Sequence, residues 1–115
     1  MKKAAILTFT SEKSVFFHAL INVIDMKDKG MDTILILEGA STKFLEDMVR
    51  EDRDFHQLYL KLKERAIIGA ICFACSKMTK TLELAESEFL PICGSLEGHV
   101  PLNEYVEAGY QIITF

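Results

Sequence analysis

Short apolar runs and amphipathic segments alternate along the chain, and this alternation constrains the fold more than any other feature. The apolar runs have the length of buried strands: Ala4–Phe9, Thr33–Leu37, Ile67–Ile71, Leu90–Cys93 and Tyr110–Phe115. Strands that alternate with helices are joined by right-handed crossovers and form a parallel sheet covered on both faces. We therefore expect one α/β domain over residues 1–115. It should have three layers and a five-stranded, mostly parallel sheet in the flavodoxin-like order 2-1-3-4-5.

Composition and charge exclude several classes of protein. The net charge of −4 argues against nucleic acid and anionic membranes, which a basic surface must neutralise. The longest apolar run, Ile67–Cys75, is far shorter than the roughly 18 residues of a membrane span. Ala4–Phe9 is too short for the apolar region of a signal peptide. We expect a cytoplasmic protein with no nucleic-acid or membrane partner.

Polar and sulfur-bearing residues stand where the predicted strands end. In open α/β sheets, ligands and chemistry collect outside the carboxyl ends of the strands. This rule selects Thr10, Ser11, Glu38, Cys72 and Cys93 as candidate site residues. Thr10 and Ser11 are also residue types that cap helices, and a helix is expected to follow them.

The sequence Cys72-Phe73-Ala74-Cys75 is the sharpest chemical signal in the chain. A thiol at a strand end and helix start lies near free backbone N–H groups, which stabilise the nucleophilic thiolate. We expect Cys72 to be reactive, with a pKa below the roughly 8.5 of a free thiol. Cys75, one helical turn further on, should be a more buried, supporting thiol. The alternative is that both are inert, because free cysteine is among the most buried residue types.

Two further residues extend this cysteine pattern. Cys93 ends the next strand, and His99 follows six residues later. With Cys72 and Cys75 they form a C-x2-C…C-x5-H set of zinc-binding residue types. Structural zinc sites more often occur in small loop-rich modules, so we expect no metal. We also expect no cofactor, since phosphate-binding and nucleotide-binding motifs do not occur and the first predicted turn, Phe9–Lys13, has no glycine.

The whole chain resembles the DsrE/DsrF-like family of small sulfur-relay proteins. The resemblance rests on the strand–helix order, on Ile67–Ile71 running into Cys72 at a helix start, and on the ending Gly98–Tyr110. It implies that Cys72 carries sulfur as a persulfide between donor and acceptor proteins, and that the chain forms a homotrimer or homohexamer. Cys75 departs from the one-cysteine pattern of the family, and a neighbouring thiol can discharge a persulfide as sulfide.

Three functions therefore stand as hypotheses. The first is a sulfurtransferase-like carrier that uses Cys72, with Cys75 close by and with Cys93, His99, Thr10, Ser11 or Glu38 in support. The second is a non-catalytic oligomeric scaffold or small-ligand binder with inert cysteines. The third is a C-x-x-C dithiol oxidoreductase, which is weakened because the chain ends on one strand and lacks a terminal hairpin.

Overall fold

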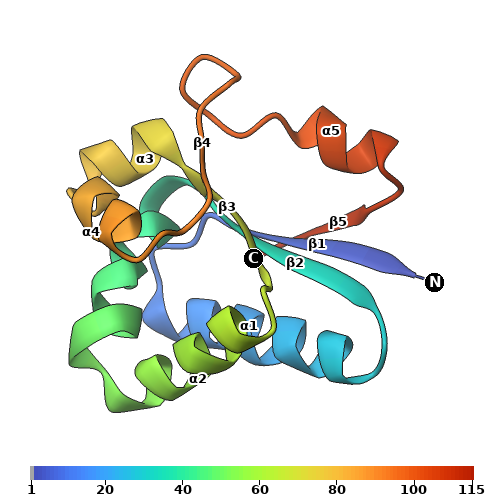
Figure 1. Ribbon diagram of the computed structural model, residues 1–115, viewed down its shortest axis with the longest axis horizontal. Helices are drawn as coiled ribbons and strands as arrows, with labels where there is room; N and C mark the ends of the chain where they lie inside the picture. Colours follow the sequence, from blue (N-terminus) through green and yellow to red (C-terminus); the bar gives the residue numbers. More distant parts are fainter. Residues whose placement is uncertain (1) are drawn as a thin grey trace.

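Strand and helix alternate in the computed structural model, which describes residues 2–115. The strands are β1 (Lys3–Thr8), β2 (Asp32–Leu37), β3 (Ile68–Cys72), β4 (Ile92–Cys93) and β5 (Gln111–Thr114). The helical elements are α1 (Lys13–Asp28), the 3-10 helix η1 (Gly39–Phe44), the π-helix η2 (Asp47–Glu51), α2 (Arg53–Glu64), α3 (Phe73–Met78), α4 (Leu82–Ser87) and α5 (Leu102–Glu107). This arrangement, drawn in Figure 1, confirms the predicted α/β class.

The five strands form one sheet in which every adjacent pair is parallel. Their order is β4-β3-β2-β1-β5, so the predicted order 2-1-3-4-5 is wrong. From β1 the chain moves in one direction through β2, β3 and β4, and then returns to place β5 beside β1. The prediction reversed direction after β2, whereas the chain reverses only after β4. The predicted domain, residues 1–115, extends one residue beyond the described part, because Met1 lies outside it.

This winding covers the two faces of the sheet unequally. Repeated right-handed crossovers in one direction place their helices on one face, which we call the thick face. Its core combines alternate strand residues with the apolar sides of α1, α2 and α4. The fully or almost fully buried members include Ile6, Phe16, Leu20, Leu35, Leu37, Phe44, Leu45, Met48, Tyr59, Leu62 and Ile71. The side chain of Phe16 stacks on that of Phe44, with ring centroids 4.6 Å apart.

The opposite face, which we call the thin face, has a smaller core. Its buried members are Ala5, Leu7, Ile36, Ala70, Cys72, Cys75 and Val100. The cover comes from the start of α3, from α5 and from the segment that leads into α5, and α5 has no buried residue. Figure 1 shows α1 and α2 together on one side of the sheet, with α5 apart from them beside β5. Alternation along β3 directs Ala70 and Cys72 to the thin face and Ile71 to the thick face.

A bulge adjusts the strand that carries the first cysteine. Leu35 of β2 pairs with Ile68 of β3, but the next residue, Ile36, pairs with Ala70 and skips Gly69. An extra residue of this kind re-aims the side chains that follow it. Cys72 then pairs in register with Cys93 of β4 at the carboxyl edge of the sheet.

Over residues 2–115, no helix has both the length and the apolar character needed to cross a membrane.

Candidate functional site

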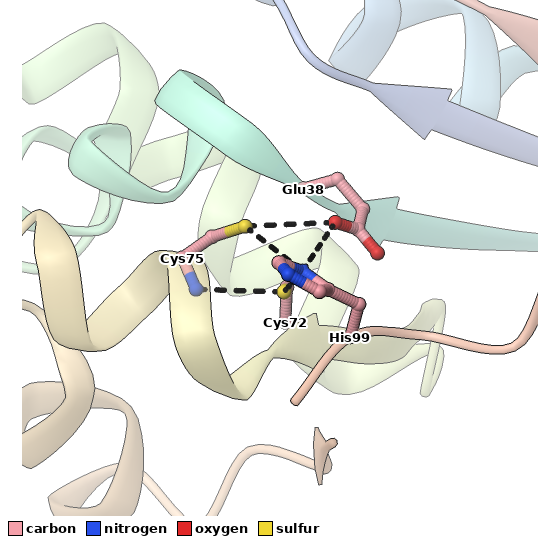
Figure 2. A group of neighbouring side chains, drawn as sticks. All are labelled: Glu38, Cys72, Cys75 and His99. Atoms are coloured by element: carbon pink, nitrogen blue, oxygen red, sulfur yellow. Dashed lines mark hydrogen bonds and ion pairs between the residues drawn. The ribbon is translucent and has the colours of Figure 1, made fainter. Parts of the chain in front are cut away.

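Four side chains meet above the carboxyl ends of β2 and β3. They belong to Glu38, Cys72, Cys75 and His99, and their potential ligand atoms all lie within 4.8 Å of one another. Figure 2 shows them converging from three segments: the end of β2, the start of α3, and the loop between β4 and α5. The rule that chemistry collects at the carboxyl edge of a parallel sheet thus selected two of the four residues, Glu38 and Cys72, whereas Cys75 and His99 were selected by the cysteine pattern.

Cys72 has two structural roles at once. It is the last residue of β3 and the N-cap of α3, where its sulfur accepts a hydrogen bond from the backbone N–H of Cys75 (3.5 Å). The same sulfur lies 3.2 Å from Nδ1 of His99 and 3.6 Å from the backbone oxygen of Gly98. The predicted placement of Cys72 at a strand end and helix start is therefore confirmed.

The electrostatic environment of Cys72 differs from the prediction. Burial, together with increases from the Cys75 side chain and from Glu38, raises the pKa of the Cys72 thiol to about 12. The hydrogen bond from the Cys75 N–H lowers this pKa, but by less than the other three effects together raise it. The helix that Cys72 caps is only six residues long, so its dipole offers little compensation. The expected low pKa is wrong. Cys75 was predicted to be the more buried thiol, but it is 9% exposed whereas Cys72 is 0% exposed.

His99 is held in place by a turn between β4 and α5. The backbone N–H of Leu96 donates to the carbonyl of His99 (3.0 Å), and the N–H of His99 donates to the carbonyl of Leu96 (2.8 Å). Gly98 has a φ of +91° and its oxygen accepts from the N–H of Ala74 (2.9 Å), which ties the loop to the first turn of α3. A side chain at position 98 would be strained by this φ. The His99 side chain is 50% exposed and forms the solvent-facing wall of the site.

Glu38 is a buried carboxylate, only 4% exposed. Its Oε1 accepts a hydrogen bond from the backbone N–H of Val100 (3.1 Å). Its Oε2 lies 3.6 Å from the sulfur of Cys75 and 3.8 Å from Nδ1 of His99. Val100 was not among the predicted site residues, and a backbone donor of this kind leaves no signal in the sequence.

The other predicted site residues lie outside this group. The sulfur of Cys93 has the hydroxyl of Ser95 as its neighbour, at 3.9 Å, so the predicted C-x2-C…C-x5-H set does not assemble. Thr10 accepts a hydrogen bond from the N–H of Glu12 (3.0 Å), and its carbonyl accepts one from Ser41. The N-cap of α1 is Glu12, without a side-chain cap bond, so the capping role expected of Thr10 and Ser11 is wrong.

A cavity of about 330 Å³ opens beside the second cysteine. It is lined by Gly39, Ala40, Cys75, Met78 and Thr79, and Met78 is 85% exposed. Cys75 thus lies at the wall of a cavity large enough for a small molecule or for a side chain of a partner. Cys72 is fully buried and is not among the residues that line this cavity.

No family model matches the chain. An archaeal relative, the uncharacterized protein MJ0733 of Methanocaldococcus jannaschii, is 30% identical over 99 residues, which make up 86% of this chain and 78% of the relative. The chain belongs to the family of this archaeal protein. The solved structure of BT1422, a conserved protein of unknown function from Bacteroides thetaiotaomicron, has a TM-score of 0.75 and 22% identity. The match covers 99% of this chain and 95% of that chain, and at this identity it shows the fold alone.

Proposed function

We propose that this protein is a sulfurtransferase-like sulfur carrier that holds a persulfide on Cys72 and passes its outer sulfur to the thiol of a partner. The observation that supports this best is the pairing of Cys72 with His99, with 3.2 Å between Sγ and Nδ1. A nucleophile with a high pKa becomes competent when a base within hydrogen-bond reach removes its proton. The resemblance to the DsrE/DsrF-like family, which assigns the sulfur to Cys72, supports the same role.

The reaction balances without an added oxidant or reductant. His99, with Nδ1 unprotonated, accepts the thiol proton of Cys72, and the carboxylate of Glu38 stabilises the resulting imidazolium at 3.8 Å. The Cys72 thiolate attacks the outer sulfur of the donor persulfide. The donor S–S bond breaks, a new S–S bond forms on Cys72, and the donor thiolate leaves and takes up a proton. An acceptor thiolate then removes the outer sulfur and regenerates the Cys72 thiolate.

Burial of Cys72 adds a requirement to this scheme. The sulfur is covered by His99 and by the loop that carries it, so residues 94–100 have to open before a donor can reach it. We expect Cys72 to react with an alkylating reagent more slowly than Cys93, which is partly exposed, yet far faster than the whole domain unfolds. Cys72 that is alkylated only when the chain unfolds would rule out the carrier role.

Mass spectrometry of the metal-free, reduced protein with a small persulfide donor tests the carrier role directly. We expect Cys72 to gain one sulfur atom, and Cys72→Ser to abolish the gain, since serine keeps a capping oxygen but cannot form a persulfide. Cys93→Ser is the matched control and should load sulfur normally, because Cys93 is outside the group. Sulfur loading that persists in Cys72→Ser contradicts the proposal.

The second cysteine, Cys75, allows a sulfur carrier to be distinguished from a dithiol oxidoreductase. Cys75 can attack the inner sulfur of a Cys72 persulfide, which forms a Cys72–Cys75 disulfide and releases sulfide. Cys75→Ser should therefore hold the persulfide as long as the unaltered protein or longer. If the unaltered protein only forms the disulfide, and Cys75→Ser transfers no sulfur to an acceptor thiol, the chain is a dithiol oxidoreductase instead.

The proposal extends to assembly and location. A homotrimer or homohexamer in the cytoplasm agrees with the family resemblance and with two exposed apolar side chains, Leu96 of the loop between β4 and α5 and Val106 of α5, which are 53% and 57% exposed. Light scattering should report three or six chains. Val106→Lys should reduce that number, whereas Leu60→Lys on α2, at a similar 52% exposure, should not. A monomer at micromolar concentration contradicts this assembly.

A further inference from the structure

The buried carboxylate of Glu38 is the least expected group in the site. Removing a carboxylate from water costs several kcal/mol unless a positive charge and hydrogen bonds compensate it. Within residues 2–115, neither lysine nor arginine forms an ion pair with Glu38, and its one possible cationic neighbour is the half-exposed His99 at 3.8 Å. Two thiols, which become negatively charged when they ionise, complete the group. Such a set of acceptors is suited to a bound cation.

Four of the six distances between ligand atoms in the group are close to those of a tetrahedral coordination shell. Zinc–ligand bonds of about 2.0–2.3 Å separate neighbouring ligand atoms of a tetrahedron by about 3.3–3.8 Å. The separations here are 3.2 Å for Cys72 Sγ to His99 Nδ1 and 3.7 Å for Cys75 Sγ to the same nitrogen. They are 3.6 Å for Cys75 Sγ to Glu38 Oε2 and 3.8 Å for His99 Nδ1 to Glu38 Oε2. The two remaining pairs, Cys72 Sγ with Cys75 Sγ and Cys72 Sγ with Glu38 Oε2, lie within 4.8 Å, so a metal ion at the centre would draw these atoms closer together.

We propose that Glu38, Cys72, Cys75 and His99 bind one zinc ion. Two thiolates, an imidazole and a carboxylate in a tetrahedral set are ligands that zinc prefers, whereas magnesium and calcium take oxygen ligands in larger shells. Binding releases the two thiol protons to solvent. The four protein atoms complete the coordination and leave no position for water, so the site holds the ion and does not activate a substrate.

The surroundings of the four ligands support the assignment. The N–H of Val100 donates to Oε1 of Glu38 and leaves Oε2 directed at the centre of the group. The N–H of Cys75 donates to the sulfur of Cys72, which suits a thiolate ligand. Hydrogen bonds of this kind orient metal ligands and tune their affinity. Figure 2 shows all four side chains pointing to one centre.

This inference does not depend on sulfur transfer. Zinc and a persulfide would compete for the same sulfur of Cys72, so each activity has to be measured without the other. Cobalt(II) titration of the reduced, metal-free protein, with no persulfide donor present, measures the metal site alone. If the protein does not load sulfur when a chelator is present, the carrier role is contradicted and the zinc site is not.

Cobalt(II) is the probe because its visible spectrum reports geometry and its near-ultraviolet spectrum reports thiolate ligands. We expect one equivalent to bind with the intense visible bands of tetrahedral cobalt and with thiolate-to-cobalt charge transfer, and zinc to displace it. A weak octahedral spectrum, or no charge-transfer band, overturns the proposal.

Variants separate this site from chance binding to thiols. Glu38→Gln and His99→Ala should each weaken zinc binding at least about tenfold. Cys93→Ser should bind zinc as the unaltered protein does, since its sulfur is outside the group. His99 is exposed, so His99→Ala should keep its fold, and circular dichroism checks this. Equal zinc affinity in His99→Ala and the unaltered protein, or equal loss in Cys93→Ser, contradicts the site.

Discussion

The two faces of the sheet differ in what their side chains do. The thick face buries large aliphatic and aromatic side chains that interlock with α1 and α2. The thin face buries alanines, cysteines and a few aliphatic residues, and its aromatic residues, Tyr105 and Tyr110, are only partly buried. Stability and chemistry are therefore separated across one sheet. Small side chains on the thin face leave room for polar groups that a tightly packed core would exclude.

The largest expected effect of a substitution therefore belongs to the thick face. Phe16→Ala removes a fully buried ring that stacks on Phe44 and lies near Phe55, and should lower the free energy of unfolding by about 3–5 kcal/mol. Tyr105→Ala removes a partly buried ring from the thin face and should cost about 1–2 kcal/mol. Urea unfolding of the two variants measures both. Similar losses of unfolding free energy in the two variants would show that the two faces contribute equally to stability.

Substitutions of two glutamates, Glu88 and Glu38, test the same difference between the two faces. Of the two, Glu88→Gln should cause the larger loss of stability. Glu88 accepts a hydrogen bond from the Tyr59 hydroxyl (2.7 Å) and pairs with Lys63 (3.3 Å), at 27% exposure. Glu88→Gln keeps the shape but weakens both interactions, so it should cost about 1 kcal/mol near neutral pH. Denaturant unfolding at pH 7 gives this number.

The contribution of Glu88 should also depend on pH. The Tyr59 hydroxyl, and then Lys63, lower the pKa of the Glu88 carboxyl below its ordinary value. A lowered folded-state pKa means that the stabilisation is complete above the unfolded pKa of about 4.3 and is lost as the pH falls through the folded pKa. The difference between the unaltered protein and Glu88→Gln should shrink as the solution is acidified. A difference that stays constant down to acid pH assigns the effect to packing alone.

The smallest effect is expected at Glu38. In the metal-free protein, Glu38→Gln keeps an oxygen for the Val100 N–H and removes a buried charge, so stability should change by less than about 0.5 kcal/mol or rise slightly. Denaturant unfolding with a chelator present measures the change in stability caused by Glu38→Gln, which is then compared with the change caused by Glu88→Gln. A loss larger than that of Glu88→Gln would mean that Glu38 serves stability and not binding.

The sequence was sufficient for the class of fold and for part of the site, for physical reasons. Apolar periodicity reports burial, so it revealed the strands and the position of Cys72 at a strand end. It carries no information on which strands pair, and the strand order was accordingly wrong. Glu38 was selected by its place after β2, but its role depends on how residues 94–100 fold back over α3. Cys93 was included because it is near Cys72 along the sheet edge, although its side chain has Ser95 as its neighbour.

The capping bond between the Cys72 sulfur and the Cys75 N–H has a spectroscopic consequence. The resonance of that amide proton depends on the electron density of the sulfur that accepts it. Thiol, persulfide, disulfide and metal-bound thiolate differ in that density. The Cys75 amide is thus a built-in reporter, and a nitrogen–proton correlation spectrum could follow every chemical state of Cys72 without any label at the sulfur itself.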